Sequence, residues 1–380
     1  MQKIKDLILK VYDRFTGCGL LEPKKFVCCF ICIFLVSLII CAAVVIWIDP
    51  YMRYHRSGAA GLKHVYHPNE ALIPGVMRYF EYDTVLFGSS VTQNFNVNEI
   101  NEILNCRSMK ATSAGLDSES LDKYLDTTIR LRCKNLKRCV IGVDLFCFSK
   151  NARPRWKDYY YLYSDDFIIP EYFYSIDTAK AIGEMIVSNL RRDSDPVAVH
   201  QMDETKMFSN KPGLLYGKKH LEYGVMQLRD SRVPLGDESV ANFEKHLYHH
   251  IRSNPDIQFD IFLPPYSIYF WCYQQEINEL EKLLEFRERF AEGLLKFPNV
   301  VLHDFHSDFS ICCNLENYKD VTHYSPQINT LILKKIASQD TRCDLTTFRQ
   351  RTVAIRNEVV KYQDEFARIR ALKDTIKRKK

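Results

Sequence analysis

The sequence predicts an α/β protein: a three-layer α/β/α domain with a mainly parallel sheet, preceded by one transmembrane helix. Three observations support this prediction. Short apolar runs rich in valine, isoleucine and phenylalanine alternate with segments of helical periodicity. Residues 26–48 carry no charged side chain. A chain of 380 residues also has room for one large α/β domain with attachments.

The predicted transmembrane helix covers residues 26–48. As a helix this segment would extend roughly 34 Å, enough to cross a hydrocarbon core of about 30 Å. The apolar region of a cleaved signal peptide is shorter. Lysine and arginine are more frequent before the segment than after it, which places residues 1–25 in the cytoplasm and the main domain outside. We therefore expect a single-pass protein of the cell membrane, held in the lipid bilayer by residues 26–48.

The outer end of this span carries the residues expected at a membrane boundary. Trp47, Tyr51 and Tyr54 are aromatic side chains of the kind found at headgroup level. Asp49-Pro50 is expected to end the helix, because the residue before a proline disfavours helical geometry. A linker is then predicted over residues 49–75.

The α/β domain is predicted over residues 76–340. Its expected strands are 83–87, 138–148, 258–263 and 300–303, and its expected helices are 97–104, 121–133 and 276–295. Residues 151–236 break this alternation, so they are predicted to be an insertion or cap, with a helical segment at 176–190. Residues 341–380 are charged and predict a long amphipathic helix, either solvated or in contact with lipid or another chain.

Several classes of partner and ligand are not predicted. The net charge of +5 is modest and forms no broad basic face, so nucleic acid is not an expected partner. Irregularly spaced cysteines argue against a disulfide scaffold. His246, His249 and His250 have a spacing that brings imidazoles together, but no convincing further ligand accompanies them. They are interpreted as surface or packing histidines, and no metal site is predicted.

A serine site is predicted where the first strand ends. Gly88-Ser89-Ser90 interrupts the apolar run and places a hydroxyl at a strand-to-helix turn. A serine becomes a nucleophile when an imidazole accepts its proton and a carboxylate orients that imidazole. Asp320 and His323 lie three residues apart and supply both groups. Carboxyl ends of parallel strands form the ligand crevice of such sheets, so Ser90 is expected there.

Three short blocks resemble the ordered blocks of the SGNH (GDSL-type) hydrolases. These blocks are Gly88-Ser89-Ser90, Ser113-Ala114-Gly115 and Asp320-Val321-Thr322-His323. The resemblance implies Ser90 as nucleophile, activated by His323 and Asp320, and an oxyanion hole made by backbone N–H groups of Ser90 and Gly115. It implies no cofactor.

The chain departs from the family pattern at two positions. Ser89 stands where the family has the aspartate of Gly-Asp-Ser, and Asp144 stands where the family has an asparagine that completes the oxyanion hole. Asn94 is a conceivable substitute donor. We expect Asn94, Asp144, Pro265 and Tyr266 to line the substrate groove.

A single amino-terminal span with an outward domain is most similar to membrane-anchored members of this superfamily, such as the teichoic acid D-alanylation and alginate O-acetylation proteins. In layout the resemblance covers about residues 26–335. It implies a serine acyltransferase or esterase acting on a cell-surface glycan or polyol polymer, beside a multi-span membrane O-acyltransferase. A non-catalytic adaptor that binds the polymer or this acyltransferase is the alternative that Asp144 and Ser89 leave open.

Overall fold

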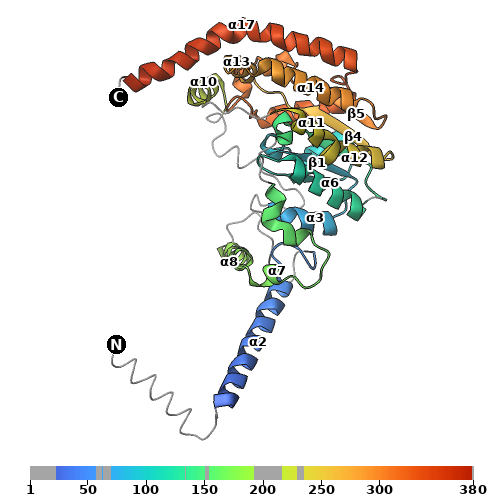
Figure 1. Cartoon of the computed structure of the whole chain (residues 1–380), viewed down its shortest axis with the longest axis vertical. Coiled ribbons are helices and arrows are strands. Elements are labelled where there is room, and N and C mark those ends of the chain that lie inside the picture. Colours follow the sequence, from blue (N-terminus) through green and yellow to red (C-terminus); the bar gives the residue numbers. More distant parts are fainter. Residues whose placement is uncertain are drawn as a thin grey trace. The chain divides into compact units, whose positions relative to one another are not determined.

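The computed structural model describes residues 23–56, 62, 70–132, 134–149, 154–191, 216–228 and 235–378. The chain divides into two compact units (Figure 1). The first consists of Met1–His64 and Asp165–Asp193, and the second of Val65–Ser164 and Ser194–Lys380. The second unit contains the sheet and the predicted serine site.

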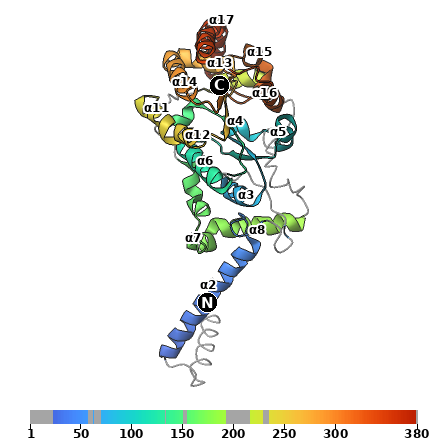
Figure 2. The same ribbon diagram turned by 90° about the vertical axis from the view of Figure 1, so that its right-hand side faces the viewer.

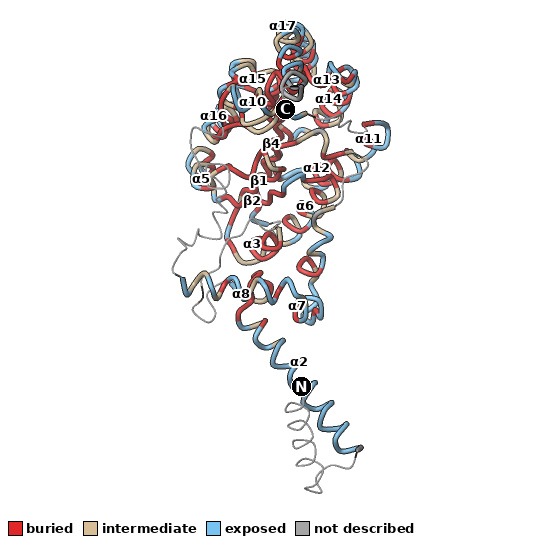
Figure 3. The backbone as a smooth tube through the Cα atoms, turned by 90° about the vertical axis from the view of Figure 1, so that its left-hand side faces the viewer, coloured by how far each residue is buried: buried red, intermediate tan, exposed pale blue. Residues whose placement is uncertain are grey.

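The sheet has five parallel strands in the order β2-β1-β3-β4-β5. They are β1 (Thr84–Gly88), β2 (Ser108–Thr112), β3 (Arg138–Gly142), β4 (Gln258–Leu263) and β5 (Val300–Asp304). Almost all residues of these strands are buried, as expected for a parallel sheet covered on both faces (Figure 3). The α/β prediction is thereby confirmed.

Helices cover both faces of the sheet, so the second unit has three layers. Figure 2 shows α5 (Val97–Leu104) and α16 (Pro326–Ser338) on one side. On the other side lie α6 (Ser118–Arg132), α12 (His249–Ser253) and α14 (Leu280–Leu294). This arrangement follows from parallel pairing, because each strand needs a crossover before the next. All five carboxyl ends therefore meet at one edge.

The strand expected over residues 138–148 is shorter than the sequence suggested. β3 ends at Gly142, and a 3₁₀ helix follows at Leu145–Phe148. The last ladder contact is the bond from Val143 N to Phe262 O, at 2.9 Å. Beyond it the chain leaves the sheet, so the apolar run continues into a second element. Hydrophobicity alone does not mark this end, because both elements are buried.

The helix expected over residues 276–295 begins later, at Leu280, as α14, and Glu276 instead ends a separate helix, α13 (Ile268–Glu276). The break falls at Asn278, whose positive φ of 58° is incompatible with a continuous helix. The carboxyl-terminal helix α17 (Leu345–Arg378) packs on both. Its buried side chains include Phe348, Thr352, Ile355, Val359, Phe366 and Ile369. One face of α17 is therefore part of the core of this unit.

The core beneath α17 contains a buried ion pair. Arg287 of α14 and Asp304 at the end of β5 lie 2.8 Å apart, and both side chains are fully buried. The guanidinium also donates to Thr352 Oγ1 at 2.7 Å and lies 4.1 Å from the ring centroid of Phe348. This cluster joins α14, the sheet and α17.

The first unit contains α2 (Pro23–Ile48), with α7 (Pro170–Tyr174) and α8 (Ile176–Arg191) packed beside it. Within α2, Lys24–Ile48 is long and apolar enough to cross a membrane, with a mean hydropathy of 3.3. Most of its side chains are exposed (Figure 3). The predicted apolar span is thus a continuous helix.

Asp49 ends this helix, as expected from its place before Pro50. It adopts a positive φ of 47°, and its carboxylate accepts from the backbone N–H groups of Arg53, Tyr54 and His55 at 2.8 to 2.9 Å. The hydroxyl of Tyr172 donates to the same carboxylate at 2.6 Å. The boundary of the apolar helix is therefore attached to α7.

Candidate active site

The turn at the end of β1 exposes Ser90. β1 ends at Gly88, Ser89 caps the short helix α4 (Ser90–Gln93), and Ser90 is its first residue. A Cβ on Gly88 would lie 2.6 Å from the side chain of Thr92, which packs into the turn. Glycine at position 88, where φ is +154°, is therefore required for this close packing.

Ser90, His323 and Asp320 lie within hydrogen-bond distance in series. Ser90 Oγ is 2.8 Å from His323 Nε2, and His323 Nδ1 is 2.8 Å from Asp320 Oδ2. The three residue types predicted from the sequence are thus brought together across 233 positions of the chain. This is the geometry in which an imidazole takes the proton of a serine and a carboxylate orients the imidazole.

Local hydrogen bonds shape the loop that carries the acid and the base. Asp320 Oδ1 accepts from the backbone N–H groups of Thr322 and His323, at 3.0 and 2.9 Å. Ser267 N donates to Val321 O at 3.0 Å, which ties this loop to the segment after β4. The loop is therefore held against the carboxyl edge of the sheet.

The pair shifts the pKa values of both groups. Burial raises the pKa of Asp320, but hydrogen bonds and charge from His323 outweigh burial and lower this pKa to about 2. Burial lowers the pKa of His323, whereas the hydrogen bond and charge of Asp320 outweigh burial and raise it above the ordinary value. The charge of Asp144 raises the pKa of His323 further. Asp320 therefore stabilises the imidazolium that forms once His323 has accepted a proton.

Ser90 opens into a cavity of about 210 Å³ at the carboxyl edge of the sheet. Its lining is Ser89, Ser90, Val91, Gly115, Leu116, Asp144, Phe146, Cys147, Tyr266 and Thr322. Ser90, Gly115, Asp144 and Tyr266 follow β1, β2, β3 and β4 respectively. The cavity therefore lies where open α/β sheets bind ligands.

The two backbone N–H groups expected to bind an oxyanion are those of Ser90 and Gly115. Ser90 and Gly115 both line the cavity. Within the described part of the chain, neither backbone N–H donates to another protein group. Gly115 has a φ of +63°, a conformation that favours glycine. Backbone N–H groups of this kind are the donors that oxyanion holes use.

Asp144 forms one wall of the cavity. The hydroxyls of Ser89 and Tyr266 each donate to one of its carboxylate oxygens. Burial raises the pKa of Asp144, and the hydrogen bonds from Ser89 and Tyr266 and the charge of His323 oppose this rise. The position that is asparagine in the SGNH sequence pattern therefore holds an acid whose two oxygens each accept a hydrogen bond from a hydroxyl.

Two residues expected in the groove lie elsewhere. Asn94 is buried and is not among the cavity-lining residues, and its amide nitrogen lies 3.5 Å from Tyr324 O. Pro265 is buried as well, and its carbonyl accepts from the Tyr318 hydroxyl at 2.8 Å. The structure brings Asp144 and Tyr266 to the cavity, but not Asn94 and Pro265.

Sequence reasoning missed several residues around this site. Phe146 and Cys147 line the cavity without forming any motif. Tyr216, from the segment expected to be a cap, lies close enough to Asp320 to interact with its charge. Burial is the larger cause and this charge the smaller cause of a rise in the pKa of Tyr216 to about 12. No local sequence pattern predicts these residues, because the packing of segments that are distant in the sequence brings them to the site.

Comparison with known proteins adds no family assignment. No protein-family model and no curated protein matches the chain. One solved structure that it matches bears the description "The structure of a putative platelet activating factor from Streptococcus pneumonia". The match has 10% sequence identity and a TM-score of 0.37, and it covers 71% of this chain and 89% of that one. At this TM-score the match supports no inference about function, so the resemblance to SGNH hydrolases rests on the three sequence blocks.

Proposed function

We propose that the chain is a membrane-anchored, extracytoplasmic serine acyltransferase or esterase that modifies hydroxyl groups of a cell-envelope polysaccharide or teichoic-acid-like polymer. The observation that carries this proposal is the series Ser90, His323, Asp320, with two hydrogen-bond distances of 2.8 Å. The cavity at Ser90 and the two N–H donors support the same chemistry.

In the proposed reaction, His323 Nε2 takes the proton of Ser90 Oγ while this oxygen attacks the carbonyl carbon of an acyl donor. The backbone N–H groups of Ser90 and Gly115 stabilise the resulting oxyanion. As the intermediate collapses, His323 returns the proton to the leaving group, and an ester forms on Ser90. A polymer hydroxyl then loses its proton to His323 and attacks this ester. As the second intermediate collapses, Ser90 Oγ leaves and takes the proton back from His323, which releases the acylated polymer.

Membrane attachment is consistent with the apolar helix at Lys24–Ile48. A protein held at the membrane surface meets an acyl donor delivered across the bilayer, so we propose a multi-span membrane O-acyltransferase as partner. With water in place of the polymer hydroxyl, the same acyl-enzyme gives an esterase.

A fluorophosphonate probe tests the catalytic part of this proposal. Full-length protein in detergent is expected to be labelled at Ser90, and labelling should be lost in Ser90→Ala and reduced at least a thousandfold in rate in His323→Ala. Ser89→Ala is the matched control, because it removes the neighbouring hydroxyl and leaves the nucleophile. Equal labelling of the parent and Ser90→Ala would overturn the assignment.

A second function is favoured by Asp144. A carboxylate beside the oxyanion site opposes the negative charge of a tetrahedral intermediate. If folded parent protein resists the probe, the chain is better described as a non-catalytic adaptor that binds envelope polymer or the membrane acyltransferase. Envelope ester content, measured by alkaline release of acyl groups from cells with and without Ser90→Ala, separates the two functions in vivo.

A further inference from the structure

Three histidines lie on one face of a helix outside the serine site. α11 (Asp237–Phe243), a π-helical turn (Glu244–Tyr248) and α12 form consecutive segments of one helical stretch. His246, His249 and His250 are spaced three and four residues apart on it, so their imidazoles share a face. π-Helical turns within α-helices are frequent at functional sites.

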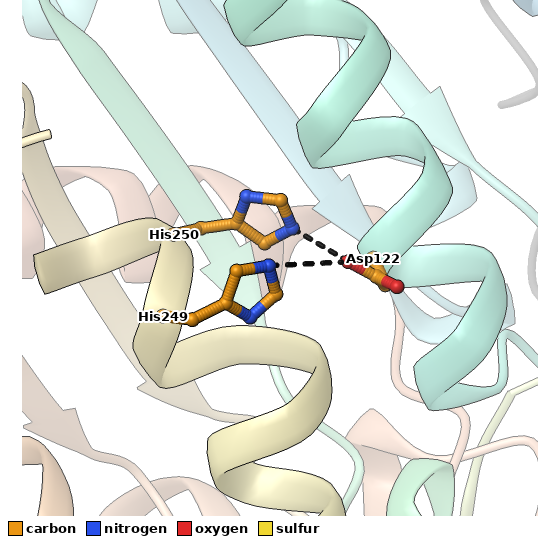
Figure 4. A group of neighbouring side chains, drawn as sticks. All are labelled: Asp122, His249 and His250. Atoms are coloured by element: carbon orange, nitrogen blue, oxygen red, sulfur yellow. Dashed lines mark hydrogen bonds and ion pairs between the residues drawn. The ribbon is translucent and has the colours of Figure 1, made fainter. Parts of the chain in front are cut away.

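Asp122 of α6 supplies the ligand that the sequence did not reveal. Figure 4 shows the imidazoles of His249 and His250 directed at its carboxylate. His250 Nε2 lies 2.7 Å and His249 Nε2 3.6 Å from Asp122 Oδ1. The three ligand atoms lie within 4.8 Å of one another. Asp122 precedes the histidines by more than 120 positions, so only the packing of α6 against this helix brings them together.

These distances suit a tetrahedral metal ion. Zinc binds imidazole nitrogen and carboxylate oxygen at about 2.0 to 2.2 Å, which separates neighbouring ligand atoms by roughly 3.3 Å. The two measured separations, 2.7 and 3.6 Å, lie on either side of this value. Small side-chain rotations therefore accommodate an ion without moving the helices.

The surroundings also suit a metal site. His246 Nδ1 lies 3.3 Å from the other carboxylate oxygen of Asp122, a contact that orients this ligand. His250 is buried, whereas the side chain of His249 is 42% exposed, so solvent reaches one side. An ion can enter from that side, and a water molecule can complete its coordination.

We propose that Asp122, His249 and His250 bind a divalent transition-metal ion, best matched by Zn²⁺, that fastens α12 to α6. Two nitrogen ligands and one oxygen ligand favour Zn²⁺, Co²⁺ or Ni²⁺ over Mg²⁺ and Ca²⁺, which prefer oxygen alone. The site contains no residue of the Ser90 cavity. Its role is to stabilise the packing of these helices.

Titration of the untagged, EDTA-treated full-length protein with CoCl₂ and ZnCl₂ tests this proposal. We expect one equivalent of Co²⁺ to give the visible absorption of a tetrahedral site, Zn²⁺ to displace it, and Zn²⁺ but not Mg²⁺ to raise the Tm. His249→Ala and Asp122→Asn should each weaken Zn²⁺ binding at least tenfold. His246→Ala, which removes the orienting contact, should weaken it about tenfold.

His220→Ala is the matched control, because His220 is an exposed histidine of α10 (Lys218–Gln227) outside the cluster. It should bind Zn²⁺ like the parent. His249 is partly exposed, so its replacement is expected to leave the far-UV circular dichroism unchanged. The proposal is overturned if the parent protein binds no Zn²⁺ at 100-fold molar excess, or if His249→Ala and His220→Ala bind it equally.

Discussion

Ser89 Oγ donates a hydrogen bond to the carboxylate of Asp144. These are the two positions at which the chain departs from the SGNH pattern, and they are in direct contact. An aspartate at position 89 would place a second carboxylate against Asp144, and two adjacent carboxylates repel each other. We therefore expect the residues at positions 89 and 144 to be energetically coupled.

This coupling can be tested by introducing the residues of the SGNH pattern at positions 89 and 144. Ser89→Asp alone is expected to destabilise the protein by about 1 to 3 kcal/mol, because it forces two carboxylates together at a half-buried site. Adding Asp144→Asn should recover most of this loss. Urea unfolding of both single variants and the double variant measures the coupling. Additive effects would show that the two positions are independent.

Asp144→Asn alone should accelerate formation of the acyl-enzyme. The substitution removes a negative charge beside the oxyanion site and adds an amide donor, and one such donor is worth roughly 100-fold in rate. Asp144→Ala is the control that removes the charge without adding a donor, so it should give a smaller gain. The rate of fluorophosphonate labelling is the measurement. A rate that falls in both variants would instead show that the acid itself takes part in the reaction.

Asp320 should control the pH dependence of the reaction. The general base must be neutral, and the hydrogen bond and charge of Asp320 raise the pKa of His323. Activity is therefore lost as the pH falls through this raised pKa. Asp320→Asn should move the acidic limb to lower pH and reduce the limiting rate by about 10⁴-fold, since the imidazolium loses its partner. A pH profile of probe labelling from pH 5 to 9 records both effects, and an unmoved acidic limb would contradict the assigned contact.

Gly142 is expected to be essential for the shape of the turn that carries Ser90. A Cβ there would lie 2.5 Å from Thr92 Cγ2 and 2.7 Å from Phe262 Cζ. Gly142→Ala should therefore lower the free energy of unfolding by about 1 to 3 kcal/mol and slow probe labelling. Gly183→Ala is the matched control: a Cβ there would meet no atom within 4 Å, and Gly183 lies inside helix α8. Thermal unfolding should show no loss for this control.

Asp304 and Arg287 should be strongly coupled in stability. Asp304→Asn leaves a guanidinium buried without its counter-charge, and such a change costs about 3 to 5 kcal/mol. Combining it with Arg287→Met removes the unpaired charge, so the double variant should be more stable than Asp304→Asn. Chemical unfolding of Asp304→Asn, Arg287→Met and the double variant measures the coupling free energy of the pair. A double variant that loses the sum of both single effects would show that the pair is not coupled.

Much of the fold was predictable because its signals are local. The strand at Gln258–Leu263 and the helix at Val97–Leu104 have the predicted bounds, since alternation and helical periodicity are properties of neighbouring residues. The end of β3 at Gly142 was not predicted, because the residues beyond it are equally apolar. The structure likewise decides that α17 packs on α13 and α14, although its sequence is as charged as that of a solvated helix.

The serine site was also only partly predictable from the sequence. Ser90, Asp320 and His323 were predicted from a strand-ending turn and a three-residue spacing, and the structure places them in hydrogen-bond contact. Their catalytic role stays a prediction. Asn94 and Pro265 were expected in the groove but lie outside the cavity lining. A position in the chain does not reveal which side of a turn a side chain occupies.

The sequence by itself determined the apolar amino-terminal helix, the parallel α/β class and the residue types of the Ser90 site. Periodicity, segment length and local spacing are properties of residues that are close together in the sequence. Only the tertiary structure decided that Asp144 rests against Ser89 and that Asp122 meets His249 and His250. Each of these contacts joins segments more than fifty residues apart. They arise from the way helices and strand ends pack, and no local pattern encodes that packing.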